Sequence, residues 1–343
     1  MKKRLNITTI NITWWGTMVL EAESDKKEIE KQMAPAWKVI SDYKMKCVVP
    51  EEPVATETDE FILYENGSKY HKFNVLNDLN NKEWLKFQKS WFVLNPHPRE
   101  ENVLLHPAKF PEELIQEFVE FFTKKGGIVF DPMVGTGSTL IACASSGRSG
   151  IGIELSEKYS LIARDRLRRI VSQQTLFEDE HVYEIFLKII HGDSRDMDQM
   201  GLPIVDYCIT SPPYWDMLLE KGFETQKKRK ERKLDLNYSD NLSDLGNIHD
   251  YDKFLDELEA VYRKVHVLLK PKGYLTIILK NVKKRNRMYP LAWDIGKRLS
   301  EFFALKDEKI WCQNNVKLAP YGYGRAWVSN TVHHYCLNFR KET

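Results

Sequence analysis

The feature that most constrains the fold is a strand, a glycine-rich turn, a helix and a second strand in close succession. An apolar run at 128–130 precedes the turn Asp131-Pro132-Met133-Val134-Gly135-Thr136-Gly137-Ser138-Thr139. A helix of small residues follows, and then an apolar strand from Gly150 to Glu154. Because parallel neighbours need a crossover connection, this order predicts a parallel βαβ unit.

The same alternation continues along the chain. Apolar strands are expected at 205–210 and 274–279, and amphipathic helices at about 251–269 and 291–303. The pattern predicts an α/β fold with a doubly wound, mostly parallel, Rossmann-like sheet and an N-terminal extension.

Two regions are expected. Residues 1–95 are irregular and rich in Trp, Asn and acidic residues, which predicts an accessory or recognition region that ends at the proline-rich break from Pro96 to Arg99. Residues 96–343 form the predicted α/β domain, with a basic insert at about 220–248. The stretch between Glu154 and Ser211 is too short for a further domain, so any recognition function is expected in the N-terminal region or the insert.

Composition adds three limits. The formal net charge of the 343 residues is only +2, so any nucleic-acid affinity must come from local basic patches rather than from the overall field. The five cysteines stand singly, which predicts a reducing, cytoplasmic setting. The paired histidines His333-His334 lack further clustered ligands, so no metal is expected. No stretch has the signal-peptide core or the roughly twenty apolar residues of a membrane span, so no membrane is expected.

The loops after the first three strands are predicted to form a nucleoside-cofactor site, since ligands of doubly wound sheets bind beyond the carboxyl ends of the strands. Gly135 and Gly137 let a ligand approach the backbone closely. Glu154 ends the next strand, where an acid can bind both ribose hydroxyls, and Asp193 is placed to accept from an adenine amino group. Leu140 replaces the third glycine of G-x-G-x-x-G, which disfavours a nicotinamide cofactor.

These residues resemble a known family. The run from Asp131 to Ser138, with Gly147-Arg148 and Gly152-Ile153-Glu154, is similar to the S-adenosylmethionine site of amino-methylating DNA methyltransferases. The upstream run from His106 to Pro111 resembles the element that closes over the cofactor in that family, although a simple helix-start turn is the alternative. The resemblance implies S-adenosyl-L-methionine as cofactor, held by His106, Phe110, Asp131, Pro132, Gly135, Gly137, Ser138, Thr139, Glu154 and Asp193.

The run Ser211-Pro212-Pro213-Tyr214 directly follows the predicted strand at 205–210 and is the predicted catalytic loop. A base amino group is a poor nucleophile, because its lone pair is delocalised into the ring. Two acceptors, the Ser211 hydroxyl and the Pro212 carbonyl, can bind its hydrogens, while Tyr214 stacks on the extruded base. No cysteine follows a proline, which disfavours methylation at a ring carbon.

The tetrapeptide resembles the motif of cytosine-N4 methyltransferases, whereas adenine-N6 enzymes more often begin it with Asp or Asn. The expected activity is therefore site-specific cytosine-N4 methylation of DNA, with a partner restriction endonuclease as an expected associate. Three alternatives stay open: an RNA cytosine-N4 methyltransferase, an adenine-N6 DNA methyltransferase, and a non-catalytic nucleic-acid-binding module.

Basic loops on the same edge of the sheet are expected to hold nucleic acid, although a charge run can equally be a solvated loop. The aromatic-rich run from Tyr321 to Trp327 is interpreted as a loop that stacks on bases or, equally, as a packed turn. The expected contacts are Trp215, Lys227, Lys228, Arg229, Lys283, Lys284, Arg285 and Arg325.

Overall fold

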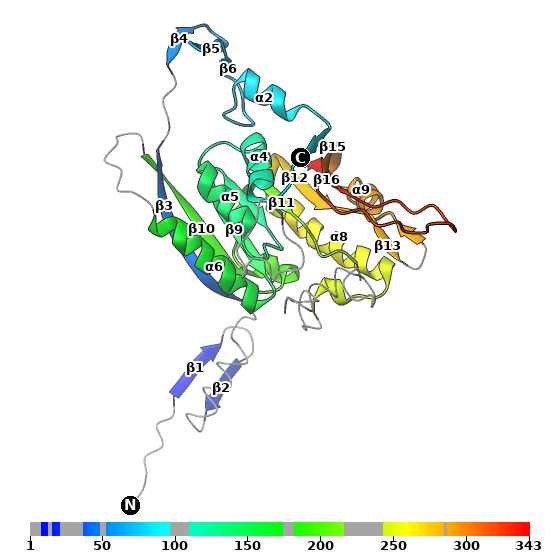
Figure 1. Ribbon diagram of the computed structural model, residues 1–343. Helices are drawn as coiled ribbons and strands as arrows, with labels where there is room; N and C mark the ends of the chain where they lie inside the picture. The colour runs from blue at the N-terminus through cyan, green and yellow to red at the C-terminus, as the bar shows by residue number, and fades with distance from the viewer. Residues whose placement is uncertain are drawn as a thin grey trace, which may run out of the picture. The chain divides into compact units, whose positions relative to one another are not determined.

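A nine-stranded sheet forms the centre of the protein in the computed structural model, which describes residues 8–12, 16–20, 37–48, 53–96, 110–173, 182–215, 243–284 and 287–343. The strand order is β3-β10-β9-β8-β11-β12-β16-β15-β7 (Figure 1). The strands are β3 (Lys38–Val48), β7 (Trp91–Val93), β8 (Ile128–Asp131), β9 (Ser149–Glu154), β10 (Val182–His191), β11 (Val205–Thr210), β12 (Leu269–Leu279), β15 (Ala304–Cys312) and β16 (His333–Arg340).

The five central strands are parallel, from β10 through β9, β8 and β11 to β12. Strand β16 runs antiparallel to both β12 and β15, and β7 pairs parallel with β15. The predicted doubly wound, mostly parallel α/β sheet is confirmed.

Helices pack on the sheet in two groups. The first comprises α4 (Glu112–Phe122), α5 (Ser138–Ser146) and α6 (Glu157–Ser172), and the second comprises α8 (Tyr251–Leu268) and α9 (Leu291–Leu299). The predicted apolar stripe of α4 is buried, including Leu114, Phe118 and Phe122. Burial of this stripe fixes the helix that precedes the first central strand.

Glycines let the cofactor turn lie close to the sheet. At Gly152 of β9, an added Cβ would lie 2.8 Å from the side chain of Val134. At Gly137 the backbone is left-handed, with φ of 87°, and starts α5. A side chain at either position would push the turn away from the strands that support it.

Elements of the N-terminal region border the sheet. Strands β3 and β7 are its two edge strands, and α2 (Asn81–Phe87) packs on α4. Strands β4 (Val54–Glu57), β5 (Phe61–Tyr64) and β6 (Lys69–His71) form a small separate sheet, and β1 (Thr8–Ile12) and β2 (Gly16–Leu20) form a hairpin in a separate compact unit. None of the described helices is long and apolar enough to cross a membrane.

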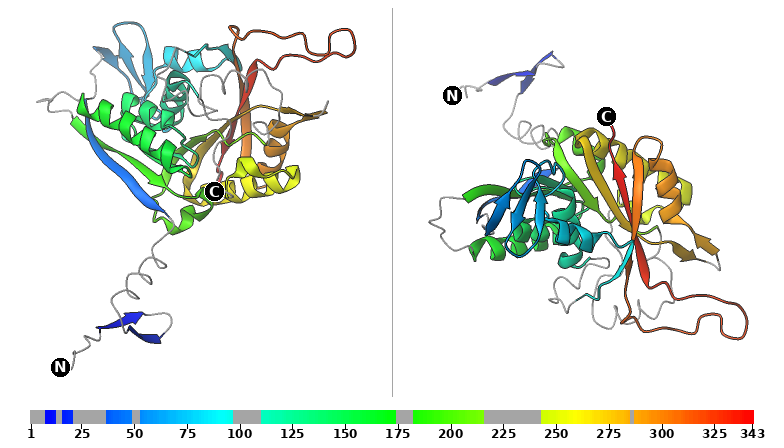
Figure 2. Two further views of the ribbon diagram at one scale, coloured as in Figure 1. Left: turned by 60° about the horizontal axis from the view of Figure 1, so that its bottom comes forward. Right: turned by 90° about the horizontal axis from the view of Figure 1, so that it is seen from above.

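One carboxyl edge of the sheet collects the loops that follow β8, β9, β10, β11 and β12, because these strands are parallel. The antiparallel register pairs Leu279 at the end of β12 with Tyr335 near the start of β16. The connection between β15 and β16, residues 313–332, therefore projects from this same edge, and it extends well beyond the sheet in Figure 2. Part of the predicted basic loop at 280–287 is a short hairpin of β13 (Val282–Lys284) and β14 (Arg287–Tyr289).

Candidate active site

Asp131 joins the predicted cofactor turn to β11, the strand that precedes the predicted catalytic loop. Its buried carboxylate accepts a hydrogen bond from Thr139 Oγ1 at 2.6 Å on one oxygen. The other oxygen accepts from Thr210 Oγ1 at 2.7 Å and from the Met133 N–H at 3.0 Å. Burial raises the pKa of Asp131, and the three donors oppose that rise. The end of β11 and the start of α5 are thus attached to one side chain.

Glu154 ends β9 and is held by the backbone on both sides. Its Oε2 accepts from the Gly135 N–H at 2.9 Å, and its Oε1 accepts from the Ser156 N–H at 2.8 Å. Burial raises its pKa to about 7, and the nearby Asp244 carboxylate adds to the rise. Each oxygen has capacity for a further donor, so the carboxylate can accept two hydroxyls of a ribose.

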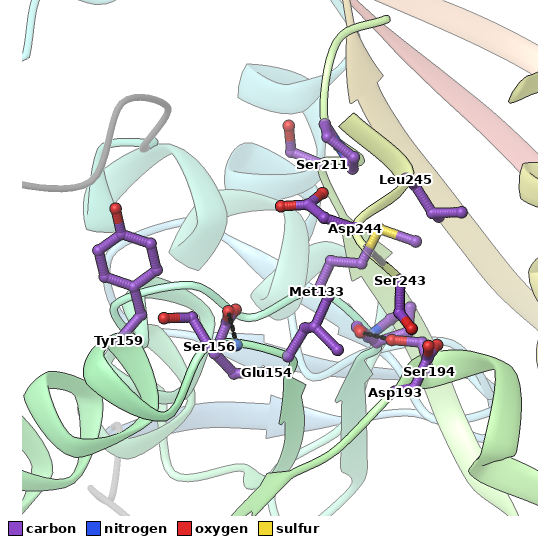
Figure 3. Close-up of a pocket in the computed structure, with 13 residues that line it drawn as sticks. Met133, Glu154, Ser156, Tyr159, Asp193, Ser194, Ser211, Ser243, Asp244 and Leu245 are labelled. Carbon is purple, nitrogen blue, oxygen red and sulfur yellow. Dashed lines mark hydrogen bonds between the residues drawn. The ribbon is translucent and has the colours of Figure 1, made fainter. Parts of the chain in front are cut away.

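A cavity lies beside Glu154 and brings the predicted cofactor and catalytic residues together (Figure 3). Its walls include Pro132, Glu154 and Asp193 from the cofactor loops, and Ser211 and Pro213 from the catalytic loop. Ser194 closes the wall by donating its hydroxyl hydrogen to the Pro132 carbonyl. The remaining lining residues are Met133, Leu155, Ser156, Tyr159, Ser194, Ser243, Asp244 and Leu245.

A second, smaller cavity continues from the first. It is lined by four more of the predicted cofactor residues, Phe110, Asp131, Ser138 and Thr139, and by Ser211 of the predicted catalytic loop, whereas Gly135 and Gly137 line neither cavity. Met133 and Ser211 border both cavities. The first cavity therefore offers acidic groups for a nucleoside and the second offers space beside the catalytic serine, an arrangement that fits S-adenosylmethionine.

The Asp193 carboxylate is bound by a neighbouring arginine, which the sequence did not indicate. Both of its oxygens accept from Arg195, with the shortest contact at 2.6 Å from Nη2. Arg195 also bonds Glu257 at 3.0 Å and the carbonyl of Ser243 at 2.7 Å. Asp193 thus lies in the cavity wall as half of an ion pair, and an adenine amino group would share this carboxylate with Arg195.

Asp244 is a lining carboxylate that the sequence analysis missed. It is buried and accepts from the Gly246 N–H at 2.8 Å, as the N-cap of a short 3-10 helix at Leu245–Asn247. An Asp two residues before a glycine is a sequence signal for such a turn. Nothing local, however, indicates that this turn folds back over the cavity.

The catalytic loop follows β11 as predicted. Ser211 reaches both cavities, Pro212 is buried, and Pro213 lines the larger cavity. The Tyr214 ring is buried, with its centroid 6.5 Å from that of His334. The loop therefore places its serine at the cavity and its tyrosine against β16.

The position of Trp215 differs from the prediction. Only 4% of this residue is exposed, and its ring packs against Tyr251 at 4.9 Å and Tyr289 at 4.5 Å between centroids. The Lys284 ammonium lies 4.6 Å from the centre of the indole. Since the ring is covered on these sides, Trp215 is a packing residue in this structure rather than an exposed nucleic-acid contact.

The predicted basic contacts are distributed over two elements. Lys283 on β13 donates to the carbonyl and hydroxyl oxygens of Ser329 at 2.6 and 2.9 Å, and so joins the β13–β14 hairpin to the 313–332 connection. Arg325 is exposed on that connection. Of the other predicted site residues, His106, Lys227, Lys228, Arg229 and Arg285 lie outside the described residues.

Within the described ranges, no three His, Cys, Asp or Glu side chains gather in a group that could hold a metal ion.

The comparisons with known proteins agree with one another, because each of the matched sequences is a DNA methylase or methyltransferase. Residues 17–165 match the profile of the DNA methylase family N6_N4_Mtase, a range that contains the glycine turn and Glu154 and ends before the catalytic loop. The orphan methyltransferase M.BamHII of Bacillus amyloliquefaciens is 33% identical over 106 residues, covering 30% of this chain and 38% of that protein. The type II methyltransferase M.HpaI of Haemophilus parainfluenzae is 28% identical over 118 residues, covering 32% and 38%.

The chain thus spans less than half the length of these curated relatives. Among solved structures, TrmN from Thermus thermophilus is similar with a TM-score of 0.38 and 16% identity, covering 67% of this chain and 48% of that one. The resemblance expected from the glycine turn is confirmed over residues 17–165, where the chain is similar to the DNA methylase family N6_N4_Mtase.

Proposed function

We propose that this protein transfers a methyl group from S-adenosylmethionine to the exocyclic N4 amine of cytosine in DNA, at a specific site. The observation that carries the proposal is the position of Ser211. This catalytic-loop residue borders the cavity that contains Glu154 and Asp193 and also the cavity that contains Phe110. The cofactor supplies an electrophilic methyl group at its sulfonium sulfur.

The chain's own residues hold and orient both reactants. Glu154 accepts the ribose hydroxyls, and Asp193 and Asp244 provide further acceptors in the wall of the same cavity. At the catalytic loop, the Ser211 hydroxyl and the Pro212 carbonyl accept the hydrogens of the amine, which turns its lone pair toward the methyl group. Tyr214, whose ring is buried beside His334 in this structure, is the proposed face for the extruded base.

Cytosine is the proposed base because the loop begins with serine. The matched family covers both amino positions, N4 of cytosine and N6 of adenine, so the base is the open part of the proposal.

Mass spectrometry of nucleosides tests which base is methylated, after the protein is incubated with labelled cofactor and either mixed duplex DNA or total RNA. Label in N4-methyldeoxycytidine is the expected result, whereas label in N6-methyldeoxyadenosine or only in RNA would assign one of the alternatives. Transfer to neither substrate would favour the non-catalytic binding module.

The tip of the 313–332 connection is proposed to contact the DNA. Reciprocal hydrogen bonds between Ala319 and the Asn330 side chain, at 2.9 and 2.8 Å, close this tip into a defined turn. Tyr323 and Trp327 are 89% and 90% exposed, with Arg325 between them. Large exposed rings next to a cation are typical of surfaces that stack on bases and bind phosphates.

Target selection is assigned to the part of the chain before residue 96 or to the insert at about 220–248. Residues 216–242 of that insert lie outside the described residues. Methylation of a fixed site would protect it from a partner restriction endonuclease, and this is the proposed biological setting. Digestion of methylated and unmethylated plasmid with nucleases that cut at the modified site tests for such protection.

A further inference from the structure

Lys280 lies on the same face of the sheet as the smaller cavity. Ile278 lines that cavity, and Lys280 follows two residues later, directly after β12 ends. Side chains two residues apart along a strand point to the same face. The register that pairs Leu279 with Tyr335 also places His334 opposite Lys280. Lys280 therefore extends the cavity wall toward the catalytic loop.

The surroundings of Lys280 belong to the catalytic loop. Its Nζ lies 6.0 Å from the centre of the Tyr214 ring, the proposed stacking face for the base. His334 lies beside Tyr214 and packs on Phe110, with 5.7 Å between the ring centres. The rings of Tyr214, His334 and Phe110 and one ammonium group thus lie together next to the predicted catalytic loop.

Besides the Tyr214 ring, the ammonium group has no oxygen partner in the part of the chain that the structure describes. Two other lysines close to the sheet are satisfied by backbone oxygens: Lys341 donates to the carbonyls of His266 and Leu269, each at 2.8 Å, and Lys309 donates to that of Lys89 at 2.6 Å. Lys280 is half-buried, and burial lowers its pKa, yet within the described ranges it makes no hydrogen bond or ion pair. A desolvated cation is costly unless an oxygen acceptor binds it.

We propose that Lys280 binds an oxygen of the extruded target nucleotide and so helps to select it. This inference rests on the proposed methyl transfer to a base amine. Ser211 and the Pro212 carbonyl are acceptors for an amine, which cytosine and adenine both carry, so they cannot distinguish the two bases. Lys280 supplies the missing donor. Its acceptor is either the O2 carbonyl of cytosine, which adenine lacks, or a phosphate next to the flipped nucleotide.

The test is a comparison of Lys280→Met, Lys280→Gln and Lys280→Arg with the wild type, in the full chain. The first readout is the dissociation constant for a duplex in which cytosine faces an abasic site, measured by fluorescence anisotropy without cofactor. The second is methyl transfer to the same duplex and to one with adenine at that position. Lys306→Met is the matched control, because Lys306 is an exposed β15 lysine at the opposite edge of the sheet.

We expect both Lys280→Met and Lys280→Gln to weaken binding about tenfold or more, as loss of a charged hydrogen bond does, while Lys306→Met changes it less than about twofold. Selective loss for cytosine over adenine assigns the base carbonyl. Equal loss for both bases, rescue by Lys280→Arg and sensitivity to a methylphosphonate at the flipped nucleotide assign the phosphate.

Unchanged binding and transfer in Lys280→Met and Lys280→Gln would overturn the inference. Thermal melts of each variant separate a folding defect from a loss of binding. Absence of transfer by the wild type would instead count against the proposed function, while the binding comparison would still decide whether Lys280 holds the nucleotide.

Discussion

Thr210 Oγ1 donates a hydrogen bond to Asp131 Oδ1 at 2.7 Å, which joins the last residue of β11 to the last residue of β8. The residue after Thr210 is Ser211, and the residues after Asp131 form the cofactor turn. The two loops that must meet for methyl transfer are therefore fixed to each other by one buried hydrogen bond.

Thr210→Val tests this connection. Removing the hydroxyl leaves one acceptor of a buried carboxylate less satisfied, so we expect the free energy of unfolding to fall by about 1–2 kcal/mol and methyl transfer to fall with it. Denaturant unfolding and steady-state kinetics measure the two effects. Thr56→Val, at an exposed position of β4, is the control for the substitution itself. A stability equal to that of the wild type would show that the bond contributes nothing.

Glu154 is expected to make cofactor affinity depend on pH. Its pKa is about 7, so the carboxylate becomes ionised as the pH rises through neutrality, and only the ionised form accepts from two hydroxyls. Cofactor affinity should increase from pH 6 to pH 8 in calorimetric titrations. Glu154→Gln should bind the cofactor at least about tenfold more weakly. Its cofactor affinity should also rise less between pH 6 and pH 8 than that of the wild type, because residue 154 no longer titrates.

Glu154 is also expected to make the stability of the fold depend on pH. A carboxyl whose pKa is raised from 4.5 to about 7 in the folded state binds its proton more tightly there than in the unfolded chain. The free energy of unfolding of the cofactor-free protein should therefore fall as the pH rises from about 4.5 to about 7, where this contribution levels off. Glu154→Gln should lose this contribution, which unfolding curves at several pH values can detect. A parallel pH dependence in the two proteins would contradict the assignment.

Catalytic-loop variants should lower turnover while leaving cofactor affinity within about threefold of the wild type. Ser211→Ala removes one acceptor for the amine, and we expect transfer to fall about 100-fold. Tyr214→Ala removes the stacking face and should reduce transfer about 10- to 100-fold, whereas Tyr214→Phe keeps the ring and should retain most activity. Separate measurement of cofactor binding and single-turnover rate distinguishes these effects from a misfolded site.

The tip of the 313–332 connection should contribute to DNA affinity. Trp327→Ala is expected to weaken DNA binding about tenfold, because base stacking is lost. Arg325→Ala is expected to reduce the slope of log binding constant against log salt concentration by about one, because one fewer counterion is released. Anisotropy titrations at several salt concentrations measure both. Trp293→Ala, which removes a half-exposed ring from α9, serves as the control. Wild-type affinity and salt slope in both tip variants would exclude the tip from the DNA interface.

The cofactor half of the site was predictable because its signals are local. Asp131, the glycine turn and Glu154 lie within one βαβ unit, so strand order alone brings them to one edge of the sheet. The catalytic loop was predictable for the same reason, since a rigid Pro-Pro pair directly follows an apolar strand.

The remaining site residues depend on long-range pairing that no local pattern encodes. Lys280 and His334 face each other only because β16 pairs antiparallel with β12. Asp244 reaches the cavity after a long insert, and Trp215 is covered by rings that come from α8 and β14. Sequence periodicity predicts that such strands and helices exist, but the neighbours of each are decided by the whole sheet.

Strands β3 and β7 have a consequence for how the chain assembles. Both precede the central strands in sequence, yet they occupy opposite ends of the finished sheet. Beside β7, the indole N–H of Trp311 donates to the carbonyl of Leu94, a residue 217 positions earlier, at 2.8 Å. During synthesis on the ribosome, β7 therefore emerges long before β15, its neighbour among the described strands of this sheet, exists. Closing this end of the sheet is a late, non-local step, and until it occurs the nascent chain exposes a strand that other chains can pair with.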